Sequence, residues 1–228
     1  MISKVRSVMR MVRRGQSREV LALLRRRWDS ELLSFGLSRD LSVPFTATEP
    51  VIPVTVRPLK NSDVAKLLDL NAPGISNEGR EERETRLQIV KANVGTCYVA
   101  ATADDTPCYM QWIIGPAENK KLRKLTYCMG TFPTLKPGEV LVEGAFTPEQ
   151  FRGQRIMPYA MSLIAEKGLS VGAKRCITFV TQENIASLKG CKRAGFAPYL
   201  VRSEKWRFFR KHVTFTPLPP GTPYPFDR

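Results

Sequence analysis

The chain has 228 residues, of which 43% are hydrophobic and 25% are charged, and its formal net charge is +15. This composition allows one folded domain with an extension and excludes a wholly disordered chain. No apolar run reaches the ~18 residues that a membrane-spanning helix needs, and the basic N-terminus lacks the continuous apolar stretch of a secretory signal.

Residues 1–40 are predicted to form a basic amphipathic helical extension. Apolar residues recur at helical spacing in two runs, first Ile2, Val5, Met9 and Val12, then Leu21, Leu24, Trp28 and Leu32. Arginines fill the other faces, which favours contact with an anionic membrane surface; packing on the domain with a solvated basic face is the plainer alternative. Contact with nucleic acid is a third alternative for the excess positive charge.

The remainder of the chain is predicted to be one α+β domain between two proline-rich segments. Residues 41–53 are expected to form an extended linker, residues 54–216 the domain, and residues 217–228 a tail that runs extended over the surface. Strands are expected at 54–58, 97–102, 108–114, 140–147, 175–181, 199–203 and 205–215. Helices are expected at 61–70, 81–90, 156–169 and 185–194.

The loop of residues 148–157 joins a predicted strand directly to a predicted helix. Free backbone N–H groups and the helix dipole at such a start bind a pyrophosphate. Gly153 lets the backbone approach the phosphates closely, and Arg152 and Arg155 add positive charge. A loop of this kind is common in other proteins, so its interpretation depends on the segment that follows.

A second motif follows this loop in register. Asn184 and Ser187 begin the next predicted helix, which closes with Gly195-Phe196. Together with Arg152-Gly153, this order and spacing resembles the GNAT superfamily of N-acyltransferases, most specifically over residues 139–196. The resemblance implies a three-layer fold, in which helices flank a central, mostly antiparallel mixed sheet with two splayed strands.

The resemblance also implies acetyl-coenzyme A (acetyl-CoA) or another acyl-CoA as co-substrate. Its pantetheine arm would pair with the strand that ends at Phe146-Thr147, and its pyrophosphate would lie on the loop. The implied binding residues are Phe146, Thr147, Arg152, Gly153, Gln154, Arg155, Ile156, Met157, Asn184 and Ser187. Arg155 and Met157 replace a glycine and a small residue of the family's loop. Since both side chains can point outward from a first helical turn, we expect retained binding with altered phosphate contacts.

Three residues are candidates for catalysis. Glu139 and Glu143 lie four apart and share one face of a regular strand, so either could be the base that deprotonates an attacking amine. Glu143 lies nearer the expected thioester, whereas Glu139 has the spacing of the base glutamate in some family members, thirteen residues before the loop arginine. Cys191 stands where many members carry a tyrosine that protonates the departing thiolate, so it is either a proton donor or a packing residue.

The five cysteines, an odd number, form no C-x-x-C pair, and the chain has a single histidine. We therefore expect no metal site, reduced thiols and a cytoplasmic protein, peripheral at the inner membrane face if the basic extension binds lipid.

The sequence favours an enzyme that moves an acetyl or other acyl group from acyl-CoA to a primary amine on a small molecule, a lipid precursor or a protein. The alternative is a catalytically silent GNAT-fold protein that binds nucleic acid or a membrane surface. The acceptor, the acyl length and the oligomeric state stay open.

Overall fold

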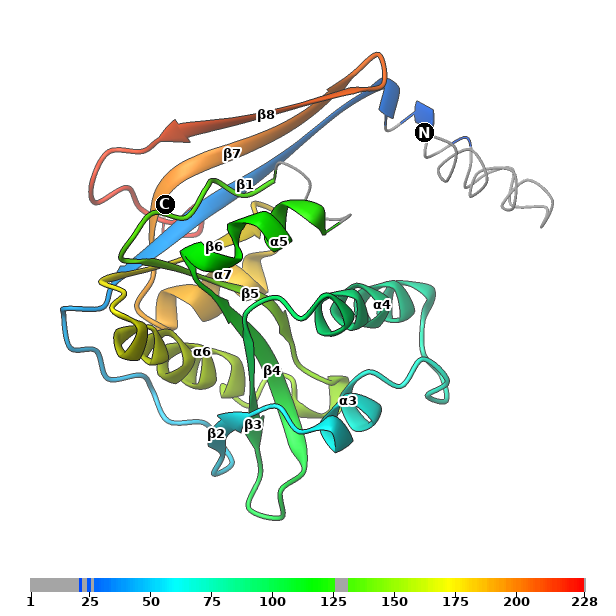
Figure 1. Cartoon of the computed structure of the whole chain (residues 1–228), viewed down its shortest axis with the longest axis vertical. Helices are drawn as coiled ribbons and strands as arrows, with labels where there is room; N and C mark the ends of the chain where they lie inside the picture. The colour runs from blue at the N-terminus through cyan, green and yellow to red at the C-terminus, as the bar shows by residue number, and fades with distance from the viewer. Residues whose placement is uncertain (1–20, 22–23, 26, 126–130, 228) are drawn as a thin grey trace.

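The computed structural model describes residues 21, 24–25, 27–125 and 131–227 (Figure 1). Its centre is an eight-stranded sheet in the order β2-β3-β4-β5-β6-β1-β7-β8. Every neighbouring pair is antiparallel except β5 and β6, which are parallel. The predicted α+β class and the mostly antiparallel mixed sheet are therefore confirmed.

The strands are β1 (Asp29–Asp40), β2 (Thr55–Pro58), β3 (Thr96–Ala101), β4 (Pro107–Ile114), β5 (Glu139–Phe146), β6 (Arg175–Thr181), β7 (Ala197–Arg207) and β8 (Arg210–Pro217). The α-helices are α3 (Asn61–Leu67), α4 (Asn77–Ala92), α5 (Asn119–Lys124), α6 (Ile156–Glu166) and α7 (Ile185–Arg193). Short 3-10 helices lie at Pro116–Glu118 (η1), Glu149–Phe151 (η2) and Lys167–Val171 (η3). Helix α4 begins earlier than predicted, because Ser76 caps it by accepting a hydrogen bond from the Gly79 amide.

Two hydrophobic cores lie on opposite faces of the sheet. One core packs α6 and α7 on strand residues such as Val140 and Val142, and the other packs α3, α4 and α5 on Leu141 and Ile177. Strand β4 is buried along its whole length, as a central strand covered by helices on both faces must be. The three predicted layers are therefore present.

The helical prediction for residues 1–40 is wrong over Asp29–Asp40, which form β1. This strand lies between β6 and β7 and pairs antiparallel with both, so it belongs to the centre of the sheet. Arg39, only 4% exposed, donates from Nη1 to Ser162 Oγ at 2.8 Å and pairs with Glu166 through Nη2 at 2.6 Å. The N-terminal segment is thereby tied to α6. The expectation for residues 1–20 lies outside the described residues.

The two proline-rich segments pack on the domain. In residues 41–53, the Phe45 ring lies under the Arg39 guanidinium at 4.8 Å, and the Val51 amide donates to the Gln154 carbonyl at 2.9 Å. In the tail, Tyr224 is buried and donates its hydroxyl to the Phe196 carbonyl at 2.8 Å. The tail therefore does not simply run over the surface, since Tyr224 is part of the core.

The last two strands are longer than predicted, and their turn lies elsewhere. The sequence pattern places the turn near residue 204, whereas β7 continues to Arg207 and Phe208-Phe209 form the turn to β8. Within the described part of the chain, no helix is long and apolar enough to cross a membrane.

Candidate active site

Strands β5 and β6 pair at their beginnings and then separate. Their parallel ladder consists of Glu139 opposite Arg175, Val140 opposite Cys176 and Leu141 opposite Ile177, and it continues no further. Residues 142–146 of β5 and 178–181 of β6 thus have no ladder to each other. The predicted divergence of these two strands is present, and it opens the sheet at the end where the loop and α6 begin.

A β-bulge lies in the separated part of β5. Between the paired positions Trp112 opposite Glu143 and Met110 opposite Phe146, β5 has one more residue than β4. Gly144 adopts a positive φ of 71° there, and a Cβ on it would lie 2.8 Å from the Trp112 ring. The carbonyl of Ala145 accepts a hydrogen bond from Arg86 Nη2 of α4 at 2.9 Å. Helix α4 is therefore fixed to the strand end that faces the opening.

The loop after β5 folds as a strand-to-helix turn. Gly153 and Arg155 adopt left-handed conformations, with φ of 79° and 59°, and Arg155 is the residue immediately before α6. The first amides of a helix precede its first intrahelical hydrogen bond, so those of Ile156 and Met157 face outward from the helix start. Pro158, the third residue of α6, has no N–H to contribute.

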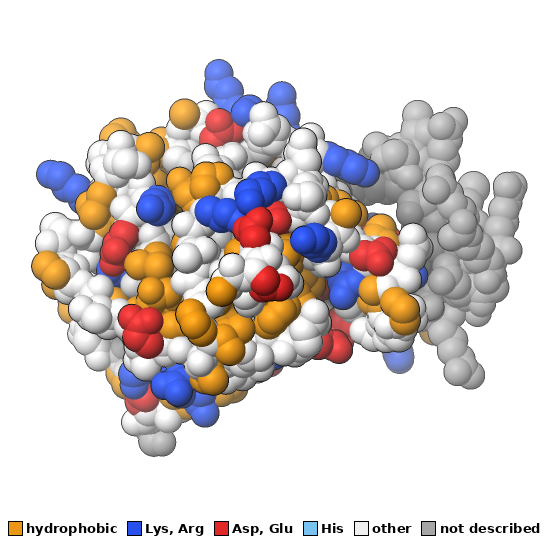
Figure 2. All heavy atoms as spheres, turned by 90° about the horizontal axis from the view of Figure 1, so that it is seen from below, with side chains coloured by type: hydrophobic (Ala, Val, Ile, Leu, Met, Phe, Trp, Pro, Cys, Tyr) orange, Lys and Arg blue, Asp and Glu red, His pale blue; other side chains and the backbone are white. Residues whose placement is uncertain are grey.

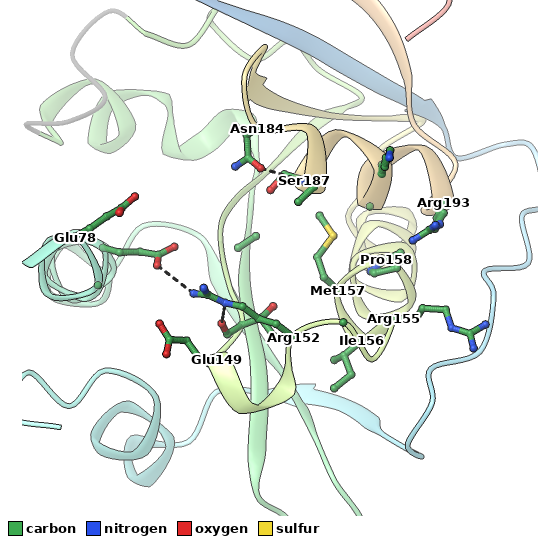
Figure 3. A pocket seen from close by; sticks show the side chains of 18 of the residues that line it. Glu78, Glu149, Arg152, Arg155, Ile156, Met157, Pro158, Asn184, Ser187 and Arg193 are labelled. Carbon is green, nitrogen blue, oxygen red and sulfur yellow. Dashed lines mark hydrogen bonds and ion pairs between the residues drawn. The ribbon is translucent and has the colours of Figure 1, made fainter. Parts of the chain in front are cut away.

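A groove of about 880 Å³ runs from α4 across the end of β5 to α6 and α7 (Figure 3). It brings together most of the residues that the motifs predicted: Thr147, Arg152, Gly153, Arg155, Ile156, Met157, Asn184 and Ser187. Four cations line it, Arg152, Arg155, Lys189 and Arg193. Four carboxylates also line it, Glu78, Glu81, Glu82 and Glu149. Three of the acidic residues belong to α4, whereas Lys189 and Arg193 belong to α7, so charges of opposite sign occupy its two ends.

The predicted binding residues Phe146 and Gln154 do not line this groove. The Phe146 side chain is buried in the core beneath α4, which leaves only its backbone free for a ligand. Gln154 donates from its amide nitrogen to the Gln150 carbonyl at 3.0 Å and supports the loop from behind.

Arg152 extends toward α4 and away from Arg155 (Figure 3). Its Nε donates to the Thr147 carbonyl at 3.1 Å, and its Nη2 lies 3.8 Å from Glu82 Oε2. These contacts hold the Arg152 side chain on the α4 side of the groove. Of the two predicted phosphate arginines, Arg155 is therefore the better placed to contact a phosphate at the start of α6.

Met157 lies between α6 and α7 and points toward Ser187 (Figure 3). A Cβ built on Gly190 of α7 would come within 2.4 Å of Met157 Sδ. The absence of a side chain at Gly190 therefore accommodates the thioether of Met157, at the loop position where the resemblance implies a small residue.

The Asn184 side chain caps α7, since its Oδ1 accepts a hydrogen bond from the Ser187 amide at 3.0 Å. Its amide nitrogen and the Ser187 hydroxyl remain the groups of this pair that can reach a ligand in the groove.

Glu143 lies on the separated part of β5, one residue before the bulge, and it is partly buried. Burial raises the pKa of this carboxyl above its usual value, and the positive charges of Arg86 and Arg202 offset part of that rise. A carboxylate with a raised pKa next to the opening has the properties of a general base.

Glu139 lies at the opposite end of β5, where β5 and β6 are still paired. It accepts a hydrogen bond from the Lys136 amide at 3.0 Å and pairs with Arg175 at 3.2 Å. These contacts close the turn into β5, and ~20 Å of strand separates Glu139 from Ala145 at the groove.

Cys191 is 1% exposed, and its Sγ contacts Met161 Sδ at 3.8 Å between α6 and α7. Burial raises the pKa of this thiol to about 12. Cys97, Cys108 and Cys176 are also free and buried, and Cys128 lies outside the described residues. Packing, the second of the two predicted roles, fits this environment of Cys191.

The sequence motifs missed the two cations of α7 and the acidic side of α4. Lys189 and Arg193 are four residues apart, a spacing that places both on one helix face. This spacing could have indicated a basic face on the helix that follows Asn184. Among the residues that the structure describes, no group of three or more His, Cys, Asp or Glu side chains is placed to hold a metal ion.

Comparison with known proteins identifies the fold. No protein-family model and no curated protein sequence matches the chain. Among solved structures, a glucosamine N-acetyltransferase region of a fungal multi-domain β-N-acetylglucosaminidase aligns with a TM-score of 0.55 and 14% identity, over 83% of this chain and 22% of that one. An acetyltransferase of the GNAT family from Colwellia psychrerythraea aligns with a TM-score of 0.49 and 10% identity, over 88% of this chain and 62% of that one. The first of these two likenesses shows that the chain has the GNAT acetyltransferase fold. The chain spans less than two thirds of either of these chains.

Proposed function

We propose that the protein is an N-acyltransferase that binds acyl-CoA where β5 separates from β6, with its phosphates in the groove at α6 and α7, and that transfers the acyl group to a primary amine. The observation that carries this proposal is the end of the β5–β6 ladder at Leu141 and Ile177. A strand edge with no partner can pair with the amide groups of a pantetheine arm, and here that edge leads directly into the loop and the start of α6.

The basic end of the groove suits the phosphates of coenzyme A. The amides at the start of α6 and the left-handed turn at Gly153 form a cradle for the pyrophosphate. Arg155, Lys189 and Arg193 line the same end and supply positive charge for a further phosphate group.

The chemistry requires a neutral amine to attack the thioester carbonyl. Glu143 takes one proton from the incoming ammonium through a water, because it does not itself line the groove, and the neutral amine then attacks the carbonyl carbon. The nitrogen of the tetrahedral intermediate loses a second proton to solvent as the carbon–sulfur bond breaks. Solvent protonates the departing coenzyme A thiolate, because Cys191 is buried with a raised pKa. The acidic side chains of α4 at the far end of the groove favour an acceptor that arrives as a cation.

A thioester-release assay tests this function. The full chain is incubated with acetyl-CoA and longer acyl-CoAs and with a panel of primary amines, and free thiol is measured. We expect saturable acyl-CoA binding by calorimetry and thiol release that depends on one class of amine. Absence of binding for every acyl-CoA would reject the proposed enzyme and favour the silent GNAT-fold protein.

The contact between Met157 and Gly190 gives a prediction about affinity. Replacing Gly190 by Ala displaces the Met157 thioether, which we expect to swing into the groove and to weaken acetyl-CoA binding by roughly tenfold, as ~1.4 kcal/mol of overpacking would do. The double variant Gly190→Ala/Met157→Ala should restore binding. Calorimetry measures the acetyl-CoA affinity of both variants. Equal affinity of Gly190→Ala and the wild type would contradict the position of Met157 in the coenzyme-binding groove.

The phosphate assignment predicts a charge effect. Arg155→Ala is expected to weaken acetyl-CoA binding several-fold, with a smaller loss at high salt because exposed charges are screened. Lys167→Ala, which removes one exposed positive charge beyond the opposite end of α6, is the matched control and should bind normally. Equal losses in the two variants would show that only overall charge matters.

A further inference from the structure

Strands β1, β7 and β8 project beyond the body of the sheet (Figure 1). The β1–β6 pairing begins at Ser34 opposite Thr181, whereas the β1–β7 pairing continues to Asp29 opposite Arg207. Five residues of β1, over ~17 Å, therefore extend beyond its ladder with β6 and form a ladder with β7 alone. The turn between β7 and β8 lies at the far end of this extension, beside Trp28.

The turn consists of two phenylalanines in an unfavourable backbone conformation. Phe208 and Phe209 have φ of 48° and 63°, so both lie in the left-handed region. A two-residue hairpin turn with positive φ at both positions prefers Asn-Gly, and bulky side chains there are strained. Phe208 is nevertheless 67% exposed and Phe209 50% exposed, so burial in the fold does not compensate for the strain. Strain of this kind is typical of sites retained for function.

Trp28 completes an exposed aromatic cluster with these two residues. Its ring centroid lies 4.9 Å from that of Phe208 and 5.8 Å from that of Phe209, edge to face in both cases. The Phe208 amide donates to the Trp28 carbonyl at 2.9 Å, which fixes the turn to the segment that enters β1. We call Trp28, Phe208 and Phe209 the aromatic tip.

Positive charge surrounds the aromatic tip. The described residues of 24–29 and 206–211 include the cations Arg25, Arg27, Arg207, Arg210 and Lys211. Arg207 pairs with Asp29 at 2.6 Å and Lys211 pairs with Glu204 at 2.6 Å, whereas Arg25 and Arg210 are exposed and Arg27 is partly exposed. Residues 1–28 of the sequence contain nine Lys and Arg and one Glu. On the face seen from below, in contrast, positive and negative side chains are interspersed (Figure 2). The excess charge of the chain is thus concentrated in the sequence that leads into the tip and follows it.

We propose that the aromatic tip binds the surface of an anionic lipid bilayer. Tryptophan and phenylalanine side chains enter the interfacial region of a bilayer, and lysines and arginines at the same level pair with the lipid phosphates. Single-stranded nucleic acid fits less well, because it stacks on open ring faces along a charged groove, whereas these rings pack edge to face at the end of a protrusion. This inference does not depend on the proposed acyltransferase activity.

Sedimentation of the full chain with vesicles tests the proposal. One set of vesicles is phosphatidylcholine alone, and the other contains added phosphatidylglycerol. We expect binding only to the anionic vesicles and release by salt. The double variant Phe208→Asn/Phe209→Gly installs the preferred turn, so its melting temperature should be unchanged or higher. Its partitioning should nevertheless be weaker by at least roughly tenfold, the order expected from the loss of even one inserted aromatic ring.

The matched control is Leu169→Ser/Val171→Ser, which removes two exposed apolar side chains from η3 and should bind vesicles as the wild type does. The proposal is overturned if the wild type does not bind anionic vesicles or if Phe208→Asn/Phe209→Gly binds them as strongly as the wild type does. It is also overturned if that variant loses only the binding of a single-stranded oligonucleotide, since the tip would then be a nucleic-acid contact.

Discussion

Replacing Leu37 by Ala is expected to lower the free energy of unfolding by about 3 kcal/mol. Leu37 is fully buried in the core between the sheet and α6, and it lies in β1, a strand paired on both sides. The truncated side chain would leave a cavity that this doubly paired strand cannot close. Urea unfolding of the full chain measures the loss.

Leu24→Ala is the matched control, because the same apolar truncation at a side chain 42% exposed should change stability by less than about 0.5 kcal/mol. If the first 40 residues were an amphipathic helix with Leu24 on its buried stripe, the order of the two effects would be reversed. That outcome would contradict the position of β1 at the centre of the sheet.

Glu143→Gln is expected to lower kcat/KM of the proposed reaction by about 10²-fold, the usual contribution of a general base. Acetyl-CoA affinity should change little, because the amide is isosteric and Glu143 does not line the groove. Glu139→Gln is the control: it removes the pair with Arg175 at the far end of β5 and should leave kcat/KM nearly unchanged. Equal losses at the two positions would contradict the assignment of the base.

The raised pKa of Glu143 also fixes the sign of its pH effects. Since only the carboxylate accepts a proton, activity should rise with pH through this pKa, and the pH–rate profile of Glu143→Gln should lack this rise.

A raised acid pKa means that the native state binds the proton more tightly than the unfolded state does. The ionised carboxylate therefore disfavours the native state above the unfolded pKa, and Glu143→Gln should be no less stable than the wild type at neutral pH.

The sequence motifs predicted which residues meet in the groove better than the sequence pattern predicted the strands of the sheet. The loop at Arg152-Gly153 and the cap at Asn184 are local motifs whose geometry depends on a few neighbouring residues, and the structure brings both to one groove. The position of Met157 depends on Gly190, a residue of another helix, and this could not be foreseen from either motif.

Strand β1 could not be recognised because its sequence shows no alternation. It is covered on both faces, so Ser34, Phe35, Gly36 and Leu37 are buried in succession. A Cβ on Gly36 would lie 2.6 Å from Leu200 Cδ1, so this glycine is set by a contact with a strand some 160 residues later in the chain. The turn at Phe208 was missed because it lacks the Asn-Gly or Asp-Gly pair that normally indicates a two-residue hairpin turn.

The most direct test is a titration of coenzyme A into the isotope-labelled full chain, followed through its backbone amide resonances. The account predicts saturable shifts confined to the separated end of β5, the loop into α6 and the first turn of α7. Saturable shifts that instead cluster elsewhere, or no binding at any accessible concentration, would show that the opening in the sheet is not a coenzyme site.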